Sequence, residues 1–311
     1  MSDAELARAA EVVRGAGQIA LACHVTPDGD ALGSMLGLFH VLRGAGRDVV
    51  ASFPSPFVVA PHYRELPGLD LLTKPEDFPV APELMMTFDC GSLDRLGDLV
   101  PAARAARELV VIDHHISNDR YGTINVIEPD AAASGWVVQR LVDTLGLPLN
   151  RDAAVCLYTA IVCDTGRFQY DTTTPEVFDL ARRLTEFDVP VARLSRALFE
   201  EHRFAYLQLL GQALAEAQLI HDQRFVWTAV TQVTSASEVR RRMSMRPSTS
   251  SRVTSWRASI ACVTAVHTKR WSWTSASSGP RSRRRCSPAT TSPSTRSRAS
   301  STSSGEPPRP R

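Results

Sequence analysis

Acidic and histidine side chains follow the ends of three short apolar runs in this sequence. The runs are QIALAC, ELMMTF and ELVVI, and they lead to His24, Asp28 and Asp30, to Asp89, and to Asp113, His114 and His115, respectively. A fourth acid, Asp164, stands near the end of a helical pattern, directly before a Thr-Gly pair. Carboxylates and imidazoles are the ligands that hard and borderline divalent cations take in proteins. These residue types therefore point to a metal site, provided that the fold brings the four segments together.

Each of these residues, taken alone, also has an ordinary structural interpretation. Asp28 and Asp30 could cap a helix that starts near residue 30, and His24 could be a hydrogen-bonded core histidine. Four carboxylates in one small volume, however, would repel one another unless cations neutralised them. Two divalent cations would do so. The six cysteines include no C-x-x-C pair, which argues against a thiolate zinc site.

The apolar patterns predict alternating strands and helices over the first 230 residues. We expect strands at 18–23, 47–53, 83–89, 108–113, 122–127 and 224–230, and helices at 3–15, 29–46, 133–145, 151–163, 175–186 and 190–218, with an Ala-rich helix between 89 and 108. Such alternation is typical of an α/β fold, a parallel sheet with helices on both faces. Ligands bind at the carboxyl ends of the strands in these sheets. The four acidic segments are thus expected to converge on one edge.

Composition favours a cytoplasmic protein. Of the 311 residues, 43% are hydrophobic, which is enough for a sizeable core. No run approaches 18 apolar residues, and the N-terminus lacks the pattern of a signal peptide, so we expect no membrane association. The cysteine spacing suggests no disulfide framework, and reduced thiols are expected.

Charge divides the chain unevenly. Residues 235–311 contain 15 Arg and one Lys against two Glu, a net charge of +14, whereas residues 1–234 carry −12. The segment 235–311 also contains 21 Ser and shows no sustained strand or helix period. A segment of this composition buries too little apolar surface to offset its ordering entropy. We therefore place a boundary between residues 234 and 235 and expect a disordered or non-native basic tail after it.

Four motifs resemble those of the DHH phosphoesterase family. They are HVTPDGDALGS (24–34), the Asp of TFDC (89), DHH (113–115) and CDTGRF (163–168), and the resemblance covers about residues 5–230. Within the family, the chain is most similar to the bifunctional oligoribonuclease and pAp phosphatase type, also called nanoRNases. The resemblance implies a DHH catalytic domain over 1–234 that hydrolyses short RNA, dinucleotides and pAp with two Mn²⁺ ions, which Mg²⁺ or Co²⁺ could replace. Cyclic dinucleotides are a further possible substrate of such enzymes.

The resemblance also assigns roles to individual residues. The implied metal ligands are His24 and Asp28 for one ion, Asp30 and His114 for the other, Asp89 as a bridge between them, and Asp164. Asp113 would orient a histidine, and His115 would face the substrate phosphate. Bridging Asp89, Asp113 and His115 form the implied catalytic group, which acts through a water activated by the two metals.

Three further residues are candidates for substrate contacts. The backbone amides around Gly33 and the Ser34 hydroxyl stand near the expected start of a helix, where an anion could bind. Arg167 follows Asp164 closely and could contact a phosphate.

The segment 235–311 departs from the family pattern. A substrate-binding domain with a G-G-G-H motif normally follows, but this segment has only Gly279, Gly305 and one histidine, His267. The segment is either a basic arm that binds nucleic acid through phosphate contacts or the product of a frame shift in a GC-rich gene. The abrupt change in composition favours the frame shift.

Two other functions compete with the nuclease. One is a manganese-dependent inorganic pyrophosphatase of the same family, and the other is a nucleic-acid-binding protein that acts through its basic tail without catalysis. The PDGDALGS segment fits the nuclease branch better than the pyrophosphatase branch. A homodimer is a further expectation.

Overall fold

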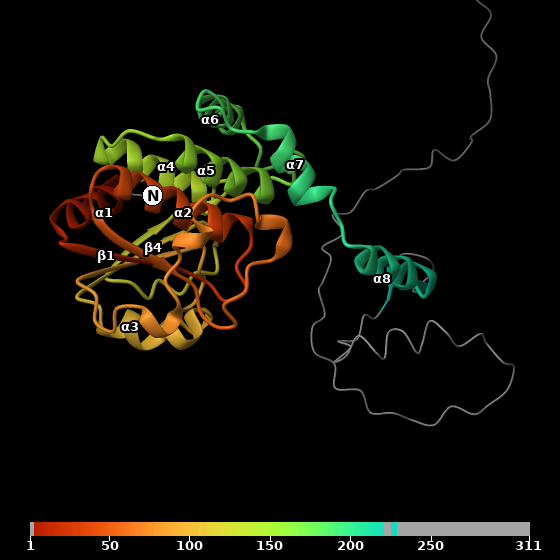
Figure 1. Cartoon of the computed structure of the whole chain (residues 1–311), viewed down its shortest axis with the longest axis horizontal. Coiled ribbons are helices and arrows are strands. Elements are labelled where there is room, and N and C mark those ends of the chain that lie inside the picture. Colours follow the sequence, from red (N-terminus) through yellow and green to blue (C-terminus); the bar gives the residue numbers. More distant parts are fainter. Residues whose placement is uncertain (1–2, 221–224, 229–311) are drawn as a thin grey trace, which may run out of the picture. The chain divides into compact units, whose positions relative to one another are not determined.

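A five-stranded parallel sheet forms the centre of the molecule (Figure 1). The computed structural model describes residues 3–220 and 225–228. The strands are β1 (Gln18–Cys23), β2 (Asp48–Ser52), β3 (Leu84–Phe88), β4 (Glu108–Asp113) and β5 (Ile124–Ile127). Their order across the sheet is β2-β1-β3-β4-β5, and every pairing is parallel. The predicted α/β fold is confirmed.

Helices cover both faces of this sheet (Figure 1). The first layer contains α1 (Asp3–Gly15), α2 (Gly29–Gly44), α4 (Ser134–Leu145) and α5 (Arg151–Asp164), and the second contains α3 (Val100–Ala105) with the 3-10 helix η4 (Leu93–Leu99). Ile19 and Leu21 of β1 pack into the core of the first layer, whereas Ala20 and Ala22 pack into the second. Successive side chains of a strand point to opposite faces of the sheet. When helices cover both faces, the strands therefore need continuous apolar runs.

Helix α2 is the central helix of the first layer. Every residue from Gly29 to Leu42 is buried, and α2 packs closely against α5. A Cβ atom on Gly33 would lie 2.5 Å from the Cys156 carbonyl oxygen and 2.8 Å from the Ala160 nitrogen. Glycine at this position therefore permits the close approach of the two helix backbones, which fixes the distance between the N-terminus of α2 and the C-terminus of α5.

The structure corrects the prediction of one helix over 190–218. This segment forms α7 (Val191–Phe199), α8 (Phe204–Ala215) and strand β6 (Gln218–Ile220), and β6 pairs with β7 (Phe225–Trp227) in an antiparallel hairpin. The interruption at 200–203 is charged and fully exposed, so no apolar packing favours a helix there. Glu201 instead forms an ion pair with Arg64. Helix α6 (Pro175–Thr185) precedes this region as predicted.

The long connection between β2 and β3 is mostly irregular. It contains three single-turn 3-10 helices, η1 (Pro61–Tyr63), η2 (Leu69–Leu71) and η3 (Pro75–Asp77). Helix α7 packs against η1. An ion pair of 2.6 Å between Arg193 of α7 and Glu65 supports this contact.

Some predictions fall outside the described residues, namely the boundary between 234 and 235 and the character of the tail. Within the described part of the chain, no helix combines the length and the apolar content that crossing a bilayer requires. The four cysteines in that part, Cys23, Cys90, Cys156 and Cys163, are free thiols.

Candidate metal centre

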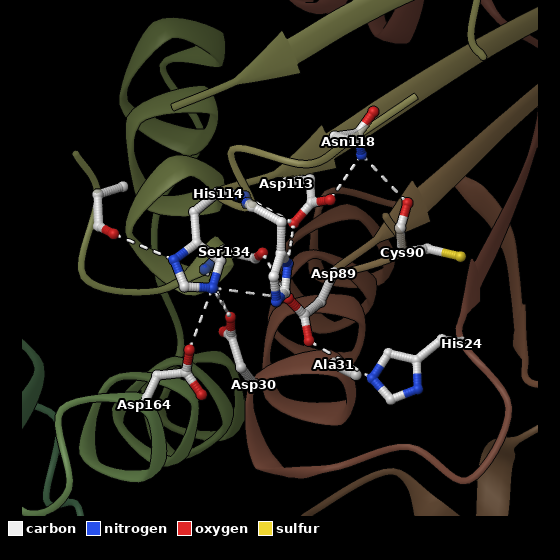
Figure 2. A network of polar contacts seen from close by, with 12 residues as sticks. His24, Asp30, Ala31, Asp89, Cys90, Asp113, His114, Asn118, Ser134 and Asp164 are labelled. Carbon is white, nitrogen blue, oxygen red and sulfur yellow. Dashed lines mark hydrogen bonds and ion pairs between the residues drawn. The ribbon is translucent and has the colours of Figure 1, made fainter. Parts of the chain in front are cut away.

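The predicted ligands meet at the carboxyl edge of the sheet. Strand β1 pairs with β2 on one side and with β3 on the other, so the strand order reverses between β1 and β3. Such reversals leave a crevice where ligands bind in open α/β sheets. His24 directly follows β1, Asp89 directly follows β3, and His114 directly follows β4. Figure 2 shows these side chains pointing toward one another, together with Asp30 of α2 and Asp164 of α5.

One group of potential ligands contains His24, Asp28 and Asp89. The His24 Nε2 atom lies 3.5 Å from Asp89 Oδ2 and 3.9 Å from Asp28 Oδ2. Asp28 is also the N-cap of α2, since its Oδ1 accepts hydrogen bonds from the backbone N–H groups of Asp30 and Ala31. The structural and the functional interpretations of Asp28 are therefore compatible, because each uses a different carboxylate oxygen.

A second group contains Asp30, His114 and Asp164. The His114 Nε2 atom lies 3.1 Å from Asp164 Oδ2 and 3.7 Å from Asp30 Oδ2. It also lies 3.7 Å from Asp89 Oδ1, the oxygen that does not face His24. Asp89 thus stands between the two groups and offers one oxygen to each.

The backbone at Asp89 has an uncommon conformation. Its φ angle is +52°, in the left-handed region that few residues other than glycine adopt. The Asp89 N–H donates to the Ile112 carbonyl of β4, which ties the turn to the neighbouring strand. Strained backbone of this kind clusters at functional sites, where the surrounding structure maintains it.

Both histidines present a free ring nitrogen to the carboxylates. The Nδ1 atoms of His24 and His114 contact the carbonyl oxygens of Val25 and Ala131, at 2.8 and 3.1 Å. In the neutral form of each ring, these contacts favour a proton on Nδ1 and leave the lone pair on Nε2, which is the form that a metal ligand needs. Both Nε2 atoms are buried and have no hydrogen-bond partner among the residues that the structure describes. A buried imidazole nitrogen without a partner, facing carboxylates at 3–4 Å, fits a metal ligand, so the donor set suits a divalent cation.

Helix α4 supports Asp30 in a way that the sequence did not reveal. The backbone N–H groups of Ser134 and Gly135 donate to Asp30 Oδ2 and Oδ1, at 2.6 and 3.0 Å. The Ser34 hydroxyl donates to Asp30 Oδ1 at 2.9 Å, and the Ser134 hydroxyl donates to Asp89 Oδ1 at 3.2 Å. Free amides at a helix N-terminus favour a carboxylate. The helix start at Ser134 was predictable, but its proximity to Asp30, 104 residues earlier, was not.

Asp113 is fully buried behind His115. Its Oδ1 accepts a hydrogen bond of 2.7 Å from His115 Nδ1 and also bonds the backbone N–H groups of both histidines. Asn118 donates to Asp113 Oδ2 at 2.6 Å and to the Cys90 carbonyl at 3.2 Å (Figure 2). Asn118 was not among the predicted residues, although it lies only five positions after Asp113.

These contacts shift the pKa values of Asp113 and His115. Burial alone raises the pKa of Asp113, but hydrogen bonds from His115 and Asn118 outweigh burial and hold this pKa below its usual value. The hydrogen bond to Asp113 in turn raises the pKa of His115. The pair therefore consists of a stable carboxylate and a histidine that retains its proton more strongly than usual.

The clustered carboxylates also affect one another. Burial, followed by the proximity of Asp89, raises the pKa values of both Asp28 and Asp30. Burial alone lowers the pKa of His114, but Asp164, Asp30 and Asp89 raise it to about 10. Without cations, the cluster thus retains protons that offset its negative charge. Divalent cations would take the place of these protons.

Two residues predicted to contact substrate lie inside the fold. Gly33 and Ser34 are buried, Gly33 against α5 and Ser34 against Asp30. The Leu32 N–H already bonds the Asp28 carbonyl, so Gly33 lies beyond the free amides of the first helical turn. Arg167 is exposed, and its guanidinium carbon lies 4.9 Å from the centre of the Phe199 ring.

Comparisons with known proteins agree with this geometry. Residues 18–161 match the DHH family, N-terminal domain. The chain is 33% identical over 208 residues to the bifunctional oligoribonuclease and PAP phosphatase NrnA of Thermus thermophilus, covering 66% of this chain and 61% of that protein. It is 29% identical over 182 residues to the protein of the same name from Bacillus subtilis, covering 57% and 55%.

One solved structure shares the fold. It is an exopolyphosphatase-related protein from Bacteroides fragilis, with a TM-score of 0.65 and 22% identity over 70% of this chain and 67% of that chain. The chain spans between about half and three fifths of the length of the curated relatives that it matches.

Proposed function

We propose that the chain is a metal-dependent phosphoesterase, because its residues 18–161 match the DHH family, N-terminal domain. Its proposed substrates are short oligoribonucleotides and pAp. The relatives named as bifunctional oligoribonucleases and PAP phosphatases support this substrate class. A cytoplasmic location and a homodimer stay predictions from the sequence.

The observation that carries the proposal is the pair of unpartnered imidazole nitrogens. His24 Nε2 and His114 Nε2 are buried and face four carboxylates, of which Asp28 and Asp30 come from the segment of His24 itself and Asp89 and Asp164 from two other segments. A core histidine without a hydrogen-bond partner is costly, because a buried polar group needs a partner to offset its lost hydration. A bound metal ion would accept the lone pair of each Nε2 atom and would neutralise the carboxylates that face it.

We assign the ligands of the two ions from this arrangement. The first ion would be held by His24, Asp28 and Asp89, and the second by Asp30, His114, Asp164 and the other oxygen of Asp89. Oxygen and imidazole donors without thiolate favour Mn²⁺, with Mg²⁺ or Co²⁺ as substitutes. Such ions supply a nucleophilic water at neutral pH and neutralise charge on the phosphoryl group.

Asp113 and His115, which follow one another closely at the end of β4, would act on the substrate. Asp113 holds Nδ1 of His115, so the opposite nitrogen is oriented away from Asp113. The His115 side chain is 43% exposed, in contrast to the nearly buried Asp89, and can therefore reach a bound phosphate. A protonated His115 would donate a hydrogen bond to a phosphate oxygen, and Asp113 would fix its direction.

Hydrolysis assays with pApA, pAp and pyrophosphate in the presence of Mn²⁺ test the proposal. We expect release of mononucleotide from pApA and of phosphate from pAp, with little activity on pyrophosphate. Removal of Mn²⁺ with a chelator should abolish both activities. Activity on pyrophosphate alone would instead support the pyrophosphatase, and nucleic-acid binding without any hydrolysis would support the non-catalytic binder.

A further inference from the structure

A pocket of about 260 Å³ adjoins the candidate metal centre. Asp28 and Asp164, each a potential ligand of a different ion, form part of its lining. Gly29, Cys163 and Leu198 also line the pocket, and its three rings are those of His62 and Tyr63 of η1 and Phe199 of α7. The pocket therefore opens directly beside the position at which a substrate phosphate would bind.

Three of the lining residues, His62, Tyr63 and Phe199, form an aromatic wall. The His62 and Tyr63 rings are tilted at 59° with their centres 4.1 Å apart, and Phe199 contributes a third ring. Burial and the neighbouring His202 lower the pKa of His62, so its ring is uncharged at neutral pH. Two ion pairs, Arg64 with Glu201 and Arg193 with Glu65, join the residues that follow η1 to α7 and to the segment after it.

Arg167 extends the aromatic wall. Its guanidinium lies over the Phe199 ring at 4.9 Å, and Gly166, Arg167 and Phe168 all have positive φ angles between 54° and 63°. This turn follows Asp164 and Thr165, and the ring over which Arg167 lies, that of Phe199, lines the pocket. A guanidinium stacked on a ring offers both a planar face and donors for an anion.

We propose that this pocket binds the nucleobase attached to the phosphate that the metal centre holds, and this inference rests on the proposed function. Its volume lies below the roughly 300–1,000 Å³ of pockets that enclose drug-sized ligands, so it suits one base rather than a dinucleotide. Stacking on aromatic side chains tolerates any base. The pocket therefore selects for nucleotides over simple phosphates without reading sequence.

Calorimetric titration of the full chain, saturated with Mn²⁺, tests the subsite by binding rather than by turnover. The probes are adenosine 5′-monophosphate and ribose 5-phosphate, which differ only in the base. We expect the nucleotide to bind about 5- to 150-fold more tightly, the range that stacking of one base provides. In Phe199→Ala, this preference should fall toward one.

Two further variants make the result specific. Phe199→Leu keeps an apolar side chain without the aromatic face and should also lose most of the preference, even if Phe199→Ala proves unstable. Phe178→Ala removes a half-exposed ring of α6 that does not line the pocket, and it should retain the preference. Equal affinities of the wild type for the two probes, or no binding of either, would overturn the subsite. A base preference in a chain that hydrolyses nothing would support the subsite and refute the phosphoesterase.

Discussion

At the scale of single residues, Asp89 connects the whole centre. Its two oxygens face different histidines, and its hydrogen bond from Ser134 links it to helix α4. The residue types and the four motifs predicted from sequence the candidate ligands that the fold brings together. The supporting contacts of Ser134, Gly135 and Asn118 were not predictable, because they depend on distances between segments that only the folded chain brings together.

Asp89→Asn should abolish binding of at least one ion. Asparagine keeps the size of the side chain, accepts a positive φ, and can still bond Ser134, but it removes the charge that both groups share. Hydrolysis should fall by more than the roughly 10–100-fold that loss of a supporting partner costs. Metal titration and circular dichroism would separate loss of metal from loss of fold.

The matched control for this change is Asp94→Asn. Asp94 is an exposed aspartate of η4, outside both groups of potential ligands. Equal losses in the two variants would contradict the role of Asp89.

Asn118→Ala should impair turnover more than metal binding. Without its hydrogen bond, Asp113 is a weaker anchor for His115, while the ligand atoms of the two metal groups are unchanged. We expect kcat to fall about 10–100-fold with the Mn²⁺ affinity altered less. Asn125→Ala, which removes hydrogen bonds to Gly122 away from the centre, should leave kcat unchanged. A drop in kcat that simply follows a drop in metal occupancy would show that Asn118 has no separate role.

At the scale of elements, the centre depends on how closely α2 and α5 pack. Asp30 lies on α2 and Asp164 ends α5, so the separation of the two helices sets the separation of the two ligands. The apolar periods predicted these elements because each strand is covered on both faces and each helix has a buried side. They failed at 200–203, where exposed charged residues interrupt the helical pattern.

Gly33→Ala should destabilise the fold. The added methyl would meet backbone atoms of α5 at less than 3 Å, and neither helix can shift without moving a ligand. Overpacking of this kind costs about 1–3 kcal/mol, which corresponds to a fall of several degrees in Tm. Gly15→Ala is the control, since nothing lies within 4 Å of its added methyl, and its Tm should change little. Thermal denaturation without metal would show whether the two variants differ as expected.

At the scale of the whole molecule, the metal centre and the basic segment belong to different parts of the chain. Every proposed ligand lies between residues 24 and 164, whereas the net charge of +14 is confined to residues 235–311. The sequence predicted the contrast in charge directly. It could not supply the geometry of the aromatic pocket, because Phe199 lies more than 130 residues after His62 and Tyr63.

Removal of residues 235–311 should leave the Mn²⁺ affinity unchanged. Binding to single-stranded RNA at low salt should weaken, because Arg-rich segments bind nucleic acid mainly through phosphate contacts that salt opposes. Titrations of the full and the shortened chain with Mn²⁺ and with RNA at two salt concentrations would measure both effects. Loss of Mn²⁺ binding on shortening would place part of the metal centre beyond residue 234.

The number of Mn²⁺ ions bound by the full chain tests the central claim most directly. Titration followed by electron paramagnetic resonance should show two ions per chain with the coupled spectrum of a pair that shares a ligand. The same experiment on Asp89→Asn should yield at most one ion and no coupling. Two uncoupled ions in the wild type, or the same stoichiometry and spectrum in both proteins, would contradict a bridged pair at this edge of the sheet.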